Sequence, residues 1–65
     1  MKSYEAFRYL MYKKEVTKAD VIRATGVTRP VLVDWENGKR EPSLKTMRRL
    51  AKYFGVPVTE FLKGE

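Results

Sequence analysis

Residues that could carry acid/base or metal chemistry are scarce in this sequence of 65 residues. It contains no Cys and no His, which excludes disulfides, thiol nucleophiles, zinc fingers and imidazole catalysis. Its eight carboxylates form no clustered acid/base pair; they are Glu5, Glu15, Asp20, Asp34, Glu36, Glu41, Glu60 and Glu65. We therefore expect a protein that is not an enzyme and that has no metal site and no cofactor.

The charged side chains of this sequence are mostly cations. Fourteen Lys and Arg against eight Asp and Glu give a net charge of +6, which favours a polyanion as partner, with nucleic acid ahead of an anionic membrane. No run approaches the ~18 consecutive apolar residues of a membrane helix. The start MKSYEAF lacks the apolar core of a secretory signal, so a cytoplasmic location is expected.

A small folded unit must position these cations. With 43% hydrophobic and 34% charged residues the chain is apolar enough to fold, and its scattered Gly and Pro residues form no linker. Residues 1–65 are therefore predicted to form a single domain. Apolar residues recur at helical spacing without strand-like alternation, which predicts an all-α bundle of about five short helices.

The first two helices are predicted from their caps. The first spans roughly residues 4–14 after Ser3, a candidate N-cap. Thr17 with Asp20 three residues later resembles a capping box, and Gly26 supplies a left-handed stop for the second helix. The apolar face of the second helix is predicted to comprise Val21 and Ala24.

The later elements are also delimited by caps and breakers. The third helix starts near residues 28–30 and ends before Asn37-Gly38, and a start with Arg29 as cap stays open because residues before proline resist helical angles. Ser43 is the predicted cap of a fourth helix that ends at Gly55, and a last turn spans 57–62. The residues spaced as core are Phe7, Leu10, Leu32, Trp35, Leu44, Met47, Leu50, Ala51, Phe54, Phe61 and Leu62.

Two short helices joined across one glycine are typical of a motif that presents its second helix to a DNA major groove. From about Tyr4 to Leu62 the sequence resembles the Cro and phage-repressor (Xre-type) helix-turn-helix family. The matching segments are Thr17, Gly26-Val27-Thr28, Trp35-Glu36-Asn37-Gly38, Pro42-Ser43, Leu50-Ala51 and Phe54-Gly55-Val56. The resemblance implies a five-helix regulator of transcription, usually dimeric on DNA, that reads a palindromic operator.

Three positions depart from the family pattern. Ile22 stands where the family usually has a small residue, and Lys18 replaces a Gln that contacts DNA in many relatives. Met11 replaces an Arg that often pairs with the Glu of the ENG motif, here Glu36. The helix crossing and the partner of Glu36 are therefore left open by the sequence.

The helical period predicts which residues of the third helix face outward. With Leu32 and Trp35 inward, Thr28 and Val31 fall toward the core flank. The outward residues are then Arg29, Pro30, Val33, Asp34 and Asn37. The family uses this outward set for contacts with bases and phosphates.

Arg29 is the leading candidate for base contact, because its planar fork can donate two hydrogen bonds to guanine O6 and N7. Pro30 suits helix initiation better than base contact. Val33 is either ordinary exposed surface or a contact to a thymine methyl, and Asp34 either accepts from cytosine N4 or is merely solvated. The candidate base contacts are Arg29, Pro30, Val33, Asp34 and Lys18.

Phosphate contacts are expected around the third helix, with free backbone N–H groups at helix starts assisting. These candidates are Thr17, Lys18, Thr28, Asn37, Lys39, Arg40, Ser43 and Lys45. They position the protein on double-stranded DNA without specifying sequence.

The resemblance also implies a homodimer whose contact follows the fourth helix, with Pro57, Val58 and Phe61 as the interface. The sequence thus predicts a Cro-like or short phage or mobile-element repressor. Two alternatives stay open: the DNA-binding half of a longer repressor or antitoxin, and a helix-turn-helix scaffold used for protein binding. The second alternative is suggested by Tyr9, Tyr12, Val31 and Val33.

Overall fold

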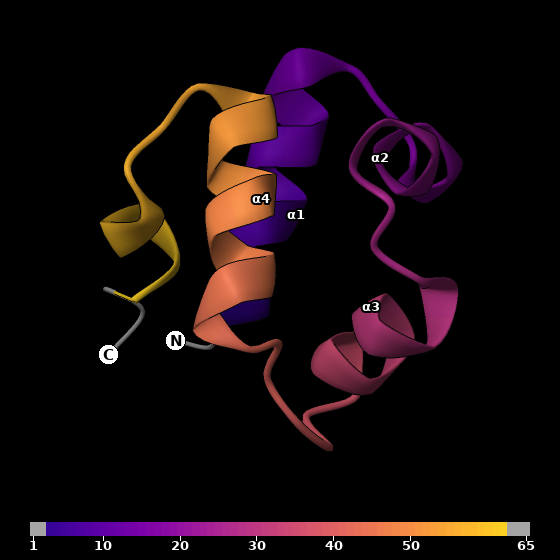
Figure 1. Cartoon of the computed structure of the whole chain (residues 1–65). Coiled ribbons are helices and arrows are strands. Elements are labelled where there is room, and N and C mark those ends of the chain that lie inside the picture. The colour runs from indigo at the N-terminus through magenta and orange to yellow at the C-terminus, as the bar shows by residue number, and fades with distance from the viewer. Residues whose placement is uncertain (1–2, 63–65) are drawn as a thin grey trace.

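The structure, a computed structural model, describes residues 3–62. These residues contain four α-helices and one 3-10 turn. In chain order they are α1 (Ser3–Lys14), α2 (Lys18–Thr25), α3 (Arg29–Glu36), α4 (Leu44–Phe54) and the 3-10 turn η1 (Val58–Phe61), shown in Figure 1. These residues contain no strand and no helix long and apolar enough to cross a membrane. The predicted all-α class is confirmed. Residues 1–2 and 63–65 of the predicted domain, Glu65 among them, lie outside the described residues.

The predicted caps of α2 and α4 are confirmed. Thr17 and Asp20 form a reciprocal capping box, in which Thr17 Oγ1 accepts from Asp20 N at 3.2 Å and Asp20 Oδ2 accepts from Thr17 N at 2.9 Å. The hydrogen bond from the Thr17 backbone lowers the pKa of Asp20 below its ordinary value. Ser43 Oγ accepts a backbone N–H of the first turn of α4. Gly26 and Gly55 end their helices at φ +78° and +72°.

The start of α1 differs from the prediction. Ser3 is the first residue of the helix rather than a cap outside it, and its side chain is buried. Its Oγ accepts from Trp35 Nε1 at 2.8 Å and donates to Glu41 Oε2 at 3.2 Å. The hydroxyl therefore joins three segments of the chain, which no local capping pattern can reveal.

Replacing Ser3 by Ala should lower the free energy of unfolding by about 1–3 kcal/mol, because the buried Trp35 N–H loses its acceptor. Urea denaturation followed by far-UV circular dichroism measures this change. The control is the same substitution in a Trp35→Phe background, where no donor is left unsatisfied and Ser3→Ala should cost much less. An equal cost in both backgrounds would contradict the role of this hydrogen bond.

The core is built around the indole of Trp35, only 2% exposed. Its ring centroid lies 5.2 Å from that of Phe7 in α1 and 5.9 Å from that of Phe61 in η1. Leu32, one turn earlier on α3, is also buried, so the predicted inward face of α3 is confirmed. The other buried apolar residues are Tyr4, Val21, Val27, Met47, Leu50 and Ala51.

Some residues predicted to face the core do not reach it. Ala24 is exposed, and Leu44 and Leu62 are 49% and 50% exposed. Leu10 and Phe54 are only partly buried at the edge of the core. Helical period assigns a face but not the point at which the neighbouring helices end, which explains the misplacement of Ala24, Leu44 and Phe54 in a first or last turn.

Candidate nucleic-acid interface

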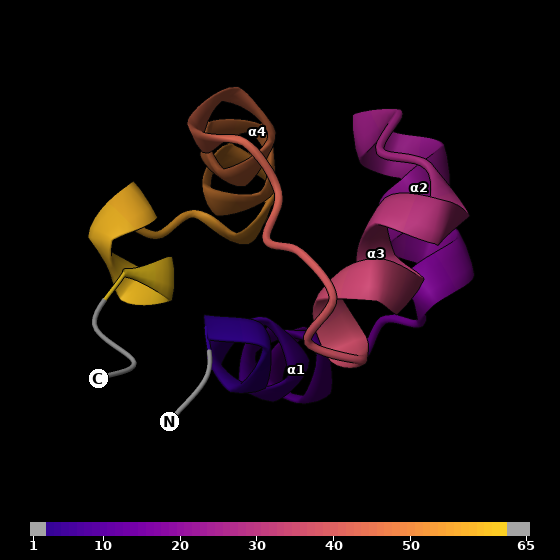
Figure 2. The ribbon, with the colours of Figure 1, turned by 90° about the horizontal axis from the view of Figure 1, so that it is seen from below.

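A tight turn between α2 and α3 presents α3 on the outside of the molecule. Gly26 adopts the left-handed conformation and donates its N–H to the Ile22 carbonyl at 2.9 Å. Val27, next along the turn, is buried and holds it to the core. Viewed from below, α3 lies over α2 with its outer side toward the viewer (Figure 2). This is the geometry of a helix-turn-helix unit.

The first turn of α3 is exposed and carries a cation. Thr28 is the N-cap but makes no side-chain capping bond, Arg29 is the first helical residue, and Pro30 follows it. The alternative start with Arg29 as the cap is therefore wrong. Both Arg29 and Pro30 are exposed, and Arg29 forms no ion pair with any residue between 3 and 62. The guanidinium is available to an external acceptor.

The rest of the predicted outward set is partly covered. Asn37 is exposed, whereas Val33 and Asp34 are half-buried. The loop after α3 folds back beside them, where Lys39 N donates to the Asp34 carbonyl at 2.8 Å. Thr28 was predicted on the core flank but is exposed, since it precedes the helix and does not share its period.

Two cations of the same loop stand at the carboxyl end of α3. Gly38 at φ +74° turns the chain, and Lys39 and Arg40 follow it with exposed side chains. The loop is held at its far end by the Glu41 carboxylate, which accepts from Ser3. Lys39 and Arg40 are therefore placed by a fixed loop, next to the end of α3.

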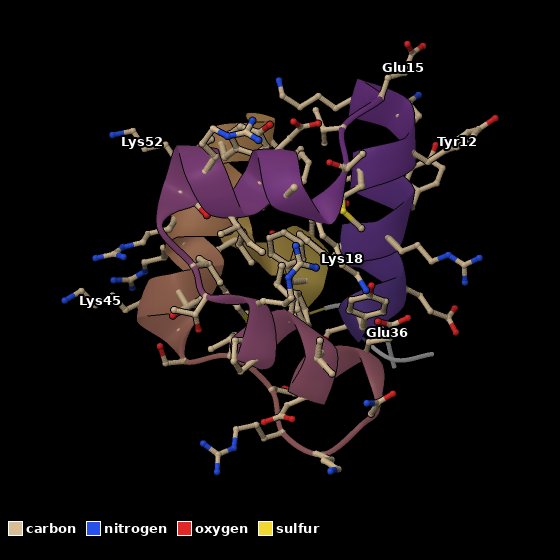
Figure 3. The ribbon with its side chains drawn as sticks, turned by 90° about the vertical axis from the view of Figure 1, so that its right-hand side faces the viewer. Tyr12, Glu15, Lys18, Glu36, Lys45 and Lys52 are labelled. Carbon is tan, nitrogen blue, oxygen red and sulfur yellow. The ribbon has the colours of Figure 1, made fainter. Side chains whose placement is uncertain are left out.

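Helix α4 adds a cationic surface that the sequence reasoning largely missed. Lys45, Arg48, Arg49 and Lys52 are all exposed, with spacing that places them on one face of the helix, and α4 contains no acidic residue. We call these four residues the α4 basic face. Lys45 and Lys52 lie along the same edge of the molecule in Figure 3. Only Lys45 was predicted, although the i, i+3, i+4, i+7 spacing was a sufficient signal for all four.

Thr17 and Ser43 have hydroxyl groups already used within the fold. Each accepts a backbone N–H as an N-cap, and Ser43 Oγ also donates to Thr46 Oγ1 at 3.2 Å. Both residues are exposed at helix starts. What they offer an anion is therefore chiefly the free backbone N–H groups of the first turns.

Lys18 lies in a different setting from the one predicted. Its Nζ is 2.6 Å from Glu36 Oε1, and the two side chains are 29% and 45% exposed (Figure 3). The hydrogen bond that Lys18 donates to Glu36 raises the pKa of Lys18 above its ordinary value, and the Tyr4 hydroxyl adds to the effect. This contact supplies the partner of Glu36 that the sequence left open.

The predicted dimer residues separate into two groups. Phe61 is completely buried against Trp35, so its assignment to an interface is wrong: the side chain belongs to the core of one chain. Pro57 is exposed and Val58 half-buried. With exposed Leu62 they form what we call the C-terminal apolar patch, Pro57, Val58 and Leu62.

Comparison with known proteins agrees with this geometry. Residues 8–61, which include the whole of α2, α3 and α4, match the family model described as helix-turn-helix. The chain belongs to the helix-turn-helix family, in its Cro and phage-repressor class. The family resemblance predicted from the sequence is thereby confirmed.

Curated helix-turn-helix relatives are regulators of transcription. The chain is 34% identical over 64 residues to the HTH-type transcriptional regulator DdrOP3 of Deinococcus deserti and 31% identical over 55 residues to the cryptic phage CTXphi transcriptional repressor RstR of Vibrio cholerae. It is 29% identical over 65 residues to the HTH-type transcriptional activator BcrR of Enterococcus faecalis. These matches cover 98%, 85% and 100% of the chain but 50%, 50% and 32% of the relatives, so it spans half their length or less. The family and these relatives are DNA-binding regulators and not enzymes.

Proposed function

We propose that this helix-turn-helix chain is a Cro-like transcriptional repressor that binds a palindromic operator in double-stranded DNA as a dimer and reads it with α3. The observation that carries the proposal is the exposed first turn of α3, where Arg29 has no ion-pair partner among residues 3–62. The name of RstR, a transcriptional repressor, supports repression. Because another relative, BcrR, is named an activator, the direction of regulation needs a test of its own. Expression of a reporter gene placed behind the operator should fall when the protein is present.

Base reading is assigned to the outer face of α3. The first turn of a recognition helix enters the major groove, where an arginine fork matches guanine O6 and N7. Arg29 takes this role, and Pro30 beside it fixes the start of the helix. Half-buried Val33 and Asp34 lie further along, where a thymine methyl and a cytosine amino group are the matching base features.

Phosphate binding is assigned to the groups at the two ends of α3. Asn37, Lys39 and Arg40 lie at its carboxyl end, and Thr28 precedes its first turn. Lys45 and the cap Ser43 stand at the start of α4, and Thr17 at the start of α2. The remaining cations of the α4 basic face strengthen the field that attracts DNA from a distance.

Dimerisation is assigned to the C-terminal apolar patch. Apolar side chains that the fold leaves wholly or partly exposed can form a two-fold interface, and Leu62 is half exposed. Pairing through this surface would present two copies of α3 to half-sites about 34 Å apart, one turn of the double helix.

Replacing Arg29 by Ala should weaken operator binding by about 1–3 kcal/mol per half-site while non-specific binding falls little, because a bidentate guanine contact is lost. Arg29→Lys should recover only part, since an ammonium cannot reproduce the fork. The measurement is a competition assay at fixed salt against a set of single-base operator variants. The preference for guanine at one symmetric position should disappear.

The control for this experiment is Arg8→Ala, which removes an exposed cation from α1 without touching α3. It should leave base preference unchanged. If Arg29→Ala weakens every operator variant by one common factor and keeps the guanine preference, Arg29 contacts phosphate and base reading belongs to other residues of α3.

A further inference from the structure

Two charged residues of the helix-turn-helix unit have the wrong sign for their own helices. Lys18 is the first residue of α2 and Glu36 the last residue of α3. A helix has a positive N-terminal end and a negative C-terminal end, so a cation at the start and an anion at the end are each unfavourable. Local propensity therefore does not account for either residue.

Across the two helices the signs become favourable. Lys18 Nζ lies 2.6 Å from Glu36 Oε1, which brings the ammonium to the negative end of α3 and the carboxylate to the positive end of α2. Figure 3 shows the two side chains pointing toward one another from their separate helices. Each charge is thus compensated by the helix of the other.

This contact lies opposite the covalent connection of the unit. The Gly26-Val27-Thr28 turn joins the end of α2 to the start of α3, while Lys18 and Glu36 join the start of α2 to the end of α3. Position 11 of α1, where the resemblance places an Arg partner for Glu36, is Met, and the ion pair links residues 18 apart in sequence. The two helices are held at both ends.

We infer that Lys18 is a positioning residue, which fixes the angle of α3 against α2 through its ion pair with Glu36 and does not itself contact DNA. The inference rests on the proposed function of α3. Lys18 Nζ donates one N–H to Glu36 Oε1 at 2.6 Å, and that carboxylate compensates its charge, so the ammonium gains less from a DNA phosphate than an unpaired cation does. Many relatives have at this position a Gln that contacts DNA. In this chain Lys18 instead holds α3, the proposed recognition helix, against α2.

The test compares Lys18→Met, Glu36→Gln and the charge swap Lys18→Glu/Glu36→Lys. Both single variants should lower the ratio of operator to non-specific affinity by about 2- to 5-fold per protomer, the range of an exposed ion pair, and the swap should restore it. Lys18→Met should leave the slope of log affinity against log salt unchanged. Lys39→Ala is the control that should flatten the slope by about 0.9 per protomer.

Direct DNA contact by Lys18 gives the opposite pattern. Lys18→Met would then flatten the salt slope as Lys39→Ala does, Glu36→Gln would keep or raise the operator affinity, and the swap would bind at least as poorly as Lys18→Met. Any of these three results would overturn the inference.

A measurement without DNA separates this inference from the proposed function. Urea denaturation of the two single variants and of Lys18→Met/Glu36→Gln should show coupling, a non-additive change of about 2- to 5-fold in the folding equilibrium constant. Strictly additive changes would overturn the ion pair as a positioning contact. If the wild-type chain selects no duplex while the coupling is present, the proposed function fails and the Lys18–Glu36 contact stands.

Discussion

The affinity of the dimer for its operator is expected to fall about 10⁴- to 10⁵-fold between 50 and 200 mM monovalent salt. Four or five phosphates neutralised by each protomer correspond to about eight to ten released counterions per dimer, and each contributes about 0.9 to the slope of log affinity against log salt. The groups assigned to these contacts surround α3, with Lys39, Arg40 and Lys45 the cations among them.

Fluorescence anisotropy of a labelled operator duplex across a salt series measures this slope. Lys39→Ala or Arg40→Ala should flatten it and weaken all sequences alike, because phosphate contacts carry no sequence information. Arg8→Ala on α1 is again the matched loss of one charge and should change the slope less. An affinity that is indifferent to salt would overturn the DNA-binding proposal and favour a protein partner.

Replacing Phe61 by Ala is expected to remove about half of the free energy of unfolding of the chain. Truncating a fully buried phenylalanine typically costs about 3–5 kcal/mol, and a domain of this length is stabilised by about 3–10 kcal/mol in total. Phe61 is 0% exposed, and its ring packs edge-on against Trp35. Thermal and urea denaturation followed by Trp35 fluorescence and circular dichroism measure the loss.

The neighbouring Leu62 provides the matched comparison, because it is half exposed. Leu62→Asp should keep the wild-type unfolding midpoint and reduce dimerisation on operator DNA, as measured by sedimentation. A Phe61→Ala variant with wild-type stability would contradict the core assignment. A Leu62→Asp variant that pairs normally would place the dimer interface elsewhere.

The parts of the fold that the sequence predicted well depend on short-range signals. Thr17 and Asp20 are three residues apart, and each satisfies the backbone of the other. The glycines that end α2 and α4 act through their own backbone conformation. Such signals are complete within a few residues, so the bounds of α2 and α4 could be read before any tertiary structure was known.

The errors concern residues whose role is set by distant segments. Ser3 carries the type of an N-cap, but Trp35, 32 residues away, takes its hydroxyl. Phe61 and Leu62 are adjacent apolar residues at the end of a 3-10 turn, where no helical period is long enough to tell which one is buried. A contact between such segments depends on the angle at which the helices cross, and the spacing of residues within one helix does not determine that angle.

The candidate site shows the same division. The outward position of Arg29 follows from the period of α3, and the structure exposes it. The half-burial of Asp34 and the ion pair of Lys18 with Glu36 on α3 depend on how segments distant in the sequence come together. Residue type alone could not show that Asp34 is half-buried or that Lys18 is paired.

The α4 basic face gives dissolved salt two opposing effects on this protein. Its four cations repel one another at spacings of three and four residues along a helix without a carboxylate, so counterions that screen this repulsion stabilise the free chain. The same ions compete with the protein for DNA phosphates and dissociate the complex. A buffer chosen to preserve the purified protein is therefore the wrong one for finding its operator, and screening for bound sequences belongs at the lowest ionic strength that the free chain tolerates.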